Sequence, residues 1–257
     1  MKNVKSLEQF MNEQVNGQNP LPQNVQPQPQ TQPSNEIDEY KKYTDKIDLT
    51  LLSPSTTIKA VEDLCAKAVE EHVYAVCIPL DFVSFAKGFL ENSDVLVCTV
   101  VDFPKGNSKT SERVKQIKEA IQKGADEIDI VFNYTKFLKD DENTEEYLLN
   151  DLKECNSECT RNSVILKVII EISMLTYENI ISVCNICKKS GVVFVKTSTG
   201  FISDDNFEEK LKKVKIIRQS IPDYMKVKLA GGIRTLDQLK RSYAIADRIG
   251  NSVIPKN

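Results

Sequence analysis

Histidine is nearly absent from this sequence: His72 is the single histidine in 257 residues. Histidine is the commonest metal ligand and the most frequent general acid or base of enzymes, so its scarcity argues against both kinds of site. His72 follows two glutamates in a polar stretch, where we expect it to lie on the surface. If the chain is an enzyme, other side chains must carry its chemistry.

Long apolar runs are also missing. No segment approaches the ~18 apolar residues that a membrane-spanning helix requires. The N-terminus has neither the apolar core of a secretory signal nor the acid-poor composition of a transit peptide. The net charge of −3 argues against nucleic acid and anionic membranes as partners, because both favour a basic face. We therefore expect a cytoplasmic protein.

The sequence has seven cysteines, and an odd number in a large, non-secreted chain predicts free thiols rather than a disulfide framework. The pairs Cys155/Cys159 and Cys184/Cys187 have a spacing that zinc sites use. The second pair, however, continues the apolar spacing of a helix, and cysteine packs well as a small apolar residue. With so little histidine, core packing is the favoured interpretation and no metal site is expected.

The beginning of the chain has few aromatic residues. Residues 12–35 are rich in glutamine and asparagine and contain five prolines, a composition that cannot bury enough apolar surface to offset the entropy of ordering. We predict a disordered tail over residues 1–35 and a folded domain over residues 36–257. The domain is expected to open with a short helix at Glu36–Lys46.

Eight β-rich runs alternate with amphipathic helical patterns in this domain. Thr235 and Gln238 have the spacing of a capping box, and Ser203 is the expected N-cap of another helix. This alternation predicts parallel βαβ units, and about 220 folded residues suit an α/β fold of the (β/α)8 TIM-barrel type. An open doubly wound sheet would usually carry a glycine-rich turn after its first strand, which is missing here. The expected strands are Ile47–Leu51, Tyr74–Ile78, Val95–Val101, Glu127–Val131, Val164–Glu171, Val192–Lys196, Lys226–Ala230 and Arg248–Asn251.

Three of the expected strands carry a lysine where a barrel is usually apolar: Lys167, Lys196 and Lys228. Side chains alternate across a strand, so these lysines can point into the barrel near its C-terminal end, where the active sites of such barrels lie. Two ammonium groups ~4 Å apart repel by roughly 4 kcal/mol at an effective dielectric of about 20. This repulsion favours an uncharged, nucleophilic amine on one of them. Because the sixth and seventh strands are neighbours, Lys196 and Lys228 are expected to lie within reach of each other.

Two acids accompany the lysines. Asp129 and Asp48 alternate with apolar residues on the fourth and first expected strands, and pairing with lysine makes a buried carboxylate tolerable. For any one of these residues alone, a structural ion pair is as good an interpretation as a catalytic role. The convergence of three lysines and two acids from five strands favours catalysis.

Glycine-rich loops follow the sixth and seventh expected strands. Gly200 closes the Lys-Thr-Ser-Thr-Gly segment, and Gly231 and Gly232 precede Arg234. Glycine lets backbone N–H groups approach an anion, and barrels often bind phosphate near this position. A tight turn alone would also explain a Gly-Gly pair, but beside the lysines we favour a phosphate site.

Together these segments resemble deoxyribose-phosphate aldolases. The resemblance runs in order from about Tyr43 to Ser252 and is most specific in Val195–Gly200 and Lys228–Thr235. It implies a class I carbon–carbon lyase that works without metal or other cofactor. Its substrate would be a small phosphosugar: 2-deoxy-D-ribose 5-phosphate would be cleaved reversibly to D-glyceraldehyde 3-phosphate and acetaldehyde, in the catabolism of deoxyribose phosphates.

The resemblance also implies roles for individual residues. Lys196 would form the Schiff base, Lys228 would keep this amine uncharged, and Asp129 would move protons together with an ordered water. Supporting members of the polar network would be Lys167, Asp48, Thr50 and Cys77, although a core thiol explains Cys77 equally well. The positions on or near the phosphate would be Gly200, Gly231, Gly232, Arg234, Gly250 and Ser252.

Three departures from the family pattern stand out. Phe201 replaces a lysine that bacterial relatives usually carry near the phosphate, Leu229 replaces a proline, and Val253 replaces a second serine. The family's final helix and tail are expected to be truncated after the eighth strand, which would leave apolar barrel surface exposed. Two other functions therefore stay open: a phosphosugar isomerase or synthase without a covalent step, and a catalytically impaired barrel used for binding. A homodimer is also left open.

Overall fold

The computed structural model of the chain describes residues 39–202 and 206–256. The predicted tail, residues 1–35, and the expected start of the domain at residue 36 lie outside this part. The position of that boundary therefore stays a prediction. Within the described residues, no helix combines the length and the apolar character that crossing a membrane requires.

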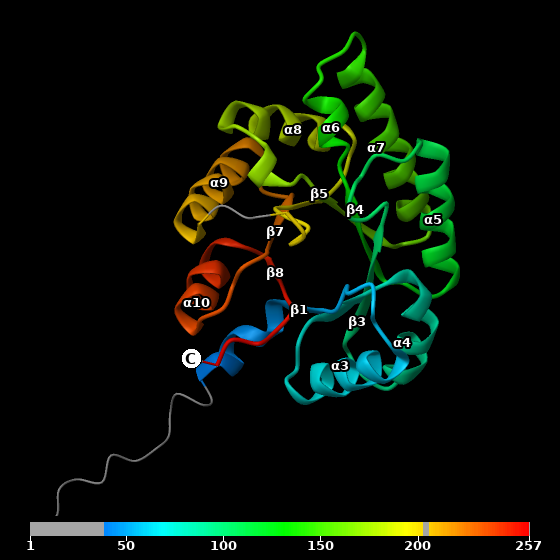
Figure 1. The fold of residues 1–257 in the computed structure, drawn as a ribbon, viewed down its shortest axis with the longest axis vertical. Coiled ribbons are helices and arrows are strands. Elements are labelled where there is room, and N and C mark those ends of the chain that lie inside the picture. The colour runs from blue at the N-terminus through cyan, green and yellow to red at the C-terminus, as the bar shows by residue number, and fades with distance from the viewer. Residues whose placement is uncertain (1–38, 203–205, 257) are drawn as a thin grey trace, which may run out of the picture. The chain divides into compact units, whose positions relative to one another are not determined.

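Eight parallel strands close into a barrel in chain order, with the last strand pairing to the first. Helices lie between successive strands and ring the barrel, as Figure 1 shows. The predicted (β/α)8 architecture is therefore confirmed. The strands are β1 (Ile47–Thr50), β2 (Ala75–Ile78), β3 (Leu96–Val101), β4 (Glu127–Val131), β5 (Ile165–Ile169), β6 (Phe194–Lys196), β7 (Lys226–Ala230) and β8 (Arg248–Asn251).

Several helices begin at a side chain that accepts a hydrogen bond from a free backbone N–H group of the first turn. Thr235 and Gln238 form the predicted capping box. The predicted cap at Ser203 was wrong, because the side chain of Asn206 accepts the backbone N–H of Glu209 and caps that helix. The α-helices are α3 (Ile58–Glu70), α4 (Val83–Phe89), α5 (Thr110–Gln122), α6 (Tyr134–Phe137), α7 (Thr144–Arg161), α8 (Tyr177–Lys189), α9 (Phe207–Ser220) and α10 (Leu236–Ile245), and the 3-10 helices are η1 (Tyr40–Lys46), η2 (Leu80–Phe82) and η3 (Ile172–Met174).

Five of the predicted strands are longer than the observed ones, and β5 is the clearest case. The prediction ran from Val164 to Glu171, whereas β5 ends at Ile169. Glu171 has a φ of 54°, which turns the chain out of the sheet. Composition does not reveal this turn, because Ile170 beyond the strand is as completely buried as the strand itself.

Side chains alternate between the interior of the barrel and the side that faces the helices. On β4, Ile128 is fully buried in the apolar core, and the next residue, Asp129, points inward. Register places Asp129 beside Lys167 and Lys196 beside Lys228 on neighbouring strands. The closed sheet thus brings charged side chains from separate strands into one layer.

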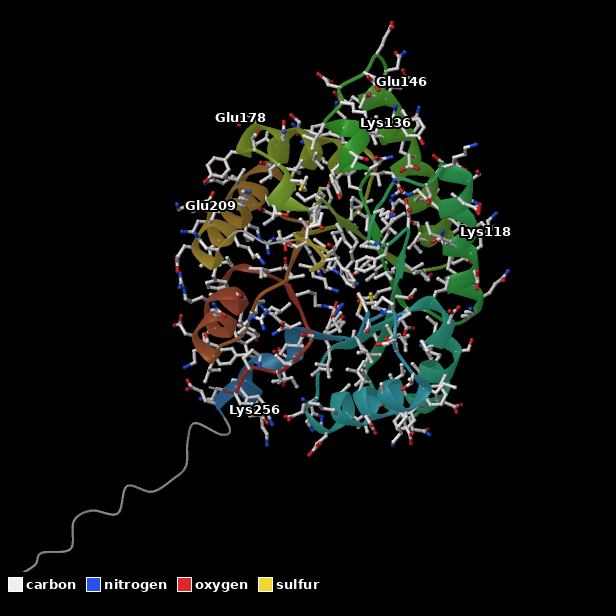
Figure 2. The ribbon with its side chains drawn as sticks, viewed as in Figure 1. Lys118, Lys136, Glu146, Glu178, Glu209 and Lys256 are labelled. Atoms are coloured by element: carbon white, nitrogen blue, oxygen red, sulfur yellow. The ribbon has the colours of Figure 1, made fainter. Side chains whose placement is uncertain are left out.

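The outer side of β8 is covered, contrary to the expectation that it would be exposed. Ile249 of β8 has no exposed surface, and Ile254 beyond it is 5% exposed. Lys256 makes a 2.9 Å ion pair with Glu71 and lies 4.7 Å from the ring centroid of Tyr40 in η1, and Figure 2 shows its place beside η1. Among the described residues, which end at 256, the barrel therefore closes without a helix after β8.

Candidate active site

Asp129 lies at the centre of a buried cluster of charged side chains. Its Oδ2 atom accepts hydrogen bonds from the Nζ atoms of Lys196 and Lys228, each at 2.8 Å. Its Oδ1 atom accepts a hydrogen bond from Lys167 Nζ at 3.0 Å. Because the Nζ atoms of Lys196 and Lys228 each lie 2.8 Å from Oδ2, they are separated by at most twice that distance. The predicted proximity of Lys196 and Lys228 is therefore confirmed.

Two further acids and one arginine complete the cluster. Asp48 Oδ2 lies 2.5 Å from Lys228 Nζ, and Glu127 Oε2 lies 2.8 Å from Lys167 Nζ. Arg248 bridges the two acids: one of its nitrogens lies 2.6 Å from Asp48 Oδ1, and the other donates to Glu127 Oε1. Because Arg248 begins β8, it closes the cluster toward the N-terminal ends of the strands.

These neighbours fix the ionisation of the buried groups. Burial raises the pKa of Asp129, but Lys167, Lys196 and Lys228 outweigh burial and hold this pKa well below its ordinary range. Burial lowers the pKa of Lys228, but Asp129 and Asp48 outweigh it and hold this pKa above its ordinary value. The pKa of Lys167 is raised by its carboxylate neighbours against burial in the same way. At neutral pH, Asp129 is therefore a carboxylate, and Lys167 and Lys228 are ammonium ions.

Lys196 differs from the other two lysines because it borders a cavity. A cavity of 340 Å³ opens at the C-terminal ends of the strands, and Lys196 is one of its lining residues. Lys167 and Lys228 have no exposed surface. Among the described residues, Lys196 forms an ion pair with one carboxylate and Lys228 with two. A small molecule in the cavity would thus meet the amine of Lys196 first.

Glycine backbones form part of the cavity wall. Gly200, Gly231 and Gly232 have φ values of 83°, 85° and 73°, a left-handed conformation that other residues rarely adopt. The predicted residues that lie together on the wall of this cavity are Thr50, Gly200, Gly231, Gly232, Arg234, Gly250 and Ser252. The structure therefore brings the predicted phosphate positions together, and their role in binding stays a prediction.

Gly250 has a second role that the sequence did not reveal. A Cβ atom at this position would lie 3.0 Å from Cε of Lys228 and 3.2 Å from Cβ of Ala230, closer than ordinary van der Waals contact. Glycine at this position therefore leaves room for Lys228 to reach Asp129.

Cys77 lies in the barrel interior beneath the cavity. It is fully buried, it pairs in register with Cys98, and it is not among the described residues that line the cavity. A hydrogen bond from Cys98 holds the pKa of Cys77 below its ordinary value. Contact between Cys77 and a substrate stays a prediction.

The cluster also contains potential metal-ligand atoms. Atoms of Cys77, Cys98 and Asp129 lie within 4.8 Å of one another, and so do atoms of Asp48, Cys98 and Glu127. Each of these carboxylates, however, already pairs with a lysine or with an arginine. A metal ion would add positive charge to a site whose acids are already matched by cations. The residues therefore fit a metal poorly.

These features agree with a comparison of the whole chain to known proteins. The family model described as DeoC/LacD family aldolase matches residues 42–253. The chain belongs to this family. The deoxyribose-phosphate aldolase of Metamycoplasma arthritidis is 40% identical over 213 residues, which cover 82% of this chain and 94% of that protein.

Further relatives support the same family. The deoxyribose-phosphate aldolase of Treponema denticola is 37% identical to this chain over 215 residues, 83% of this chain and 95% of that protein. A crystal structure assigned to a deoxyribose-phosphate aldolase from Coccidioides immitis has a TM-score of 0.76 at 34% identity and covers 83% of each chain. The family resemblance inferred from the sequence is confirmed.

Arg248 and Glu127 of this aldolase were missed by reasoning from the sequence. Each begins a strand, two positions before a residue that had been recognised, Gly250 on β8 and Asp129 on β4. Alternation along the strand would have placed both inside the barrel. The signal was weak because a charged residue at a strand start usually faces solvent.

Glu171 is a third residue that was not assigned to the site from the sequence, and it fixes the loop after β6. Its Oε2 atom accepts hydrogen bonds from the hydroxyl of Thr199 and from the Thr199 backbone N–H at 3.2 Å. Instead of continuing β5 as expected, Glu171 therefore holds the Thr-Ser-Thr-Gly segment that ends at Gly200.

An aromatic pair stands at the rim of the cavity. Phe201, which lines the cavity, is 51% exposed, and its ring meets the ring of Phe103 edge to face with centroids 5.1 Å apart. Phe201 therefore gives this part of the rim an apolar surface.

Proposed function

We propose that this chain is a 2-deoxy-D-ribose 5-phosphate aldolase that forms a Schiff base on Lys196. The reaction is that of a class I aldehyde-lyase: the sugar phosphate is cleaved reversibly to D-glyceraldehyde 3-phosphate and acetaldehyde. The observation that carries the proposal is the position of Lys196, between the cavity and the buried charges around Asp129. Relatives named deoxyribose-phosphate aldolase, 37% and 40% identical to this chain, support the choice of substrate.

The balance of charge supports a free amine on Lys196. The ammonium ions of Lys167 and Lys228, together with the guanidinium of Arg248, already match three carboxylates. A fourth buried cation would lack a carboxylate of its own, which is costly in a low-dielectric interior. The acidic residues of the cluster are Asp48, Glu127 and Asp129. The basic residues are Lys167, Lys196, Lys228 and Arg248.

The free amine attacks C1 of the open-chain sugar and forms a carbinolamine, which loses water to give a protonated imine. The C3 hydroxyl then loses its proton, the bond between C2 and C3 breaks, and its electron pair moves into the imine to form an enamine. C3 leaves as the aldehyde carbon of D-glyceraldehyde 3-phosphate. Protonation of the enamine at C2 and addition of water release acetaldehyde and restore the amine.

We assign the movement of protons in these steps to Asp129. Its carboxylate lies 2.8 Å from Lys196 Nζ, so an ordered water beside it would reach both the carbinolamine hydroxyl and the nitrogen. Because Asp129 is ionised in this cluster, it can accept a hydrogen bond from that water and orient it for the transfer. The ammonium of Lys228, bound to the same oxygen, would hold this carboxylate in place.

The cavity suits a five-carbon sugar phosphate whose aldehyde end lies at Lys196. The glycine loops would then receive the phosphate, since backbone N–H groups bind phosphate oxygens at short range. Arg234 and Ser252 are exposed at the same wall and would complete the anion site.

The cellular setting is part of the same proposal. The protonated imine itself accepts the electron pair of the broken bond, so the reaction requires neither a metal nor an organic cofactor. Degradation of deoxyribose phosphates in the cytoplasm is the role that goes with this substrate. Whether the chain works as a homodimer stays a prediction, which light scattering on the purified protein would test.

Trapping with borohydride tests the proposal. The protein is incubated with deoxyribose 5-phosphate or with acetaldehyde, reduced, digested and mapped by mass spectrometry. We expect a stable adduct on Lys196 and none in Lys196→Ala. The matched control is Lys188→Ala, which changes an exposed lysine on α8 and should trap as the unchanged protein does.

Each outcome separates the competing functions. Turnover of deoxyribose 5-phosphate with an adduct on Lys196 supports the aldolase. Isomerase turnover without an adduct would favour the isomerase or synthase, and a chain inert in both assays would favour a binding module. Trapping that persists in Lys196→Ala would show that the nucleophile has been wrongly assigned.

A further inference from the structure

Lys210, on α9, reaches the back of the glycine loop that follows β7. Its side chain is buried, and the residue is 1% exposed. Its Nζ atom donates a hydrogen bond to the carbonyl oxygen of Ala230 at 3.1 Å and another to that of Gly231. A buried ammonium therefore holds two successive peptide groups of this loop.

The two contacts of Lys210 also fix the direction of two backbone N–H groups. In a trans peptide the C=O and N–H groups point in opposite directions, and among the described residues the cis bond recorded is Phe103–Pro104. The N–H groups of Gly231 and Gly232 therefore point away from Lys210. Both glycines line the cavity and Lys210 does not, so the two amides are directed to the cavity side.

Within the part of the chain that the structure describes, these two amides have no acceptor. In residues 39–202 and 206–256, neither Gly231 N–H nor Gly232 N–H donates a hydrogen bond to another residue. By contrast, the Ala230 N–H donates to the hydroxyl of Thr197 at 2.9 Å, and the same hydroxyl donates to the Ala230 carbonyl at 3.2 Å. Thr197 thus anchors the start of the loop, and its two following donors remain available to a ligand.

We propose that Lys210 is a positioning residue of the anion site: it orients and polarises the Gly231 and Gly232 amides toward the phosphate of the substrate. A cation on a carbonyl oxygen draws electron density from the peptide and makes its N–H a stronger donor. In this arrangement Lys210 acts through the backbone and does not touch the ligand. The identity of the ligand as a sugar phosphate rests on the proposed function.

A comparison of two substrates tests this role. We expect Lys210→Met to lower kcat/KM for deoxyribose 5-phosphate at least about tenfold more than for unphosphorylated 2-deoxyribose, mainly through KM, because the amides that would bind the charged phosphate are no longer held in place. Lys210→Arg should restore most of the difference, since a guanidinium also donates to two carbonyls. Lys212→Met, an exposed lysine on the same helix, is the matched control and should change neither value.

An equal loss on both substrates, or no loss on either, would overturn the role of Lys210. Should Lys210→Met fail to fold, Lys210→Gln replaces it with the same expected direction. If the unchanged protein turns over neither sugar, the proposed function fails, and calorimetric titration with inorganic phosphate tests Lys210 alone. At least about tenfold weaker phosphate binding in the variant supports the role, whereas equal affinities or no binding by the unchanged protein contradict it.

Discussion

Lys196 and Lys228 donate hydrogen bonds to the same oxygen atom, Oδ2 of Asp129, each at 2.8 Å. Their strands are neighbours and the two residues are partners in register, yet their surroundings differ. Lys228 also pairs with Asp48 and has no exposed surface, whereas Lys196 borders the cavity. Two chemically identical side chains are thereby distinguished by position: Lys228 is enclosed by carboxylates, and Lys196 faces the cavity.

Lys228→Leu should slow Schiff-base trapping about tenfold or more near neutral pH. Lys228 and Lys196 share one carboxylate oxygen, so this substitution removes the charge that lies beside the proposed nucleophile. The measurement is the rate of adduct formation with acetaldehyde. Lys228→Arg keeps the charge and serves as the control. An unchanged rate in Lys228→Leu would contradict the assignment.

Asp129→Asn should destabilise the fold by about 3–5 kcal/mol, because it removes the carboxylate that three buried lysines share. Denaturant unfolding followed by circular dichroism measures the change. The control is Asp63→Asn, which breaks an exposed pair with Lys59 and should cost no more than about 1 kcal/mol. Equal effects of the two substitutions would mean that the buried cluster contributes little to stability.

The cluster should also shape the dependence of stability on pH. The pKa of Asp129 is lowered on folding, so its contribution is complete above its unfolded value, about 3.9, and disappears as pH falls through the folded value. The pKa values of Lys167 and Lys228 are raised, so their contribution is complete below about 10.4 and is lost at higher pH. The contribution of these groups to the free energy of unfolding should therefore be flat between about pH 5 and 9. In Asp129→Asn, the free energy of unfolding should decrease less as the pH falls below about 5.

Phe201→Lys should lower KM for deoxyribose 5-phosphate several-fold. The residue is half exposed at the rim of the cavity, where a cation would attract the doubly charged phosphate. The gain should decrease as salt is added, because the charge is exposed to solvent. Phe201→Met is the uncharged control. A similar decrease of KM in both variants would show that the aromatic ring obstructs the site and that charge is not the cause.

Chelators should leave the aldolase activity unchanged. All seven cysteines are free and buried, and burial raises the pKa of Cys155, Cys159 and Cys184 to about 12. These three thiols would rarely supply the thiolate that zinc binds, and the carboxylates beside Cys77 and Cys98 are already paired with cations. Activity after dialysis against a chelator, together with slow alkylation of the native thiols at pH 8, would check this. Loss of activity that zinc restores would contradict it.

The order of strands and helices could be predicted from the sequence, because the alternation of apolar residues is a local property. Strand ends were less well predicted, since the apolar residues that follow the end of β5, near Glu171, are also buried. His72 is exposed, as its polar neighbours indicated. Local sequence patterns thus indicate whether a segment is buried, but they indicate less precisely where a strand ends.

The lysines and Asp129 stood out in the sequence because charge is rare inside a strand. Arg248 and Lys210 did not, since a charged residue at a strand start or on a helix is ordinary. Their importance depends on what lies opposite: Asp48 and Glu127 for Arg248, and the loop after β7 for Lys210.

The sequence by itself determined the βαβ repeat, the family and the residues able to form a Schiff base, because each is encoded in residue types at fixed spacing. Tertiary structure alone decided which lysine meets the cavity, which carboxylates hold the others as cations, and why Gly250 carries no side chain. The physical reason is that closure of the barrel sets distances between residues far apart in the chain. Burial and charge interactions depend on those distances.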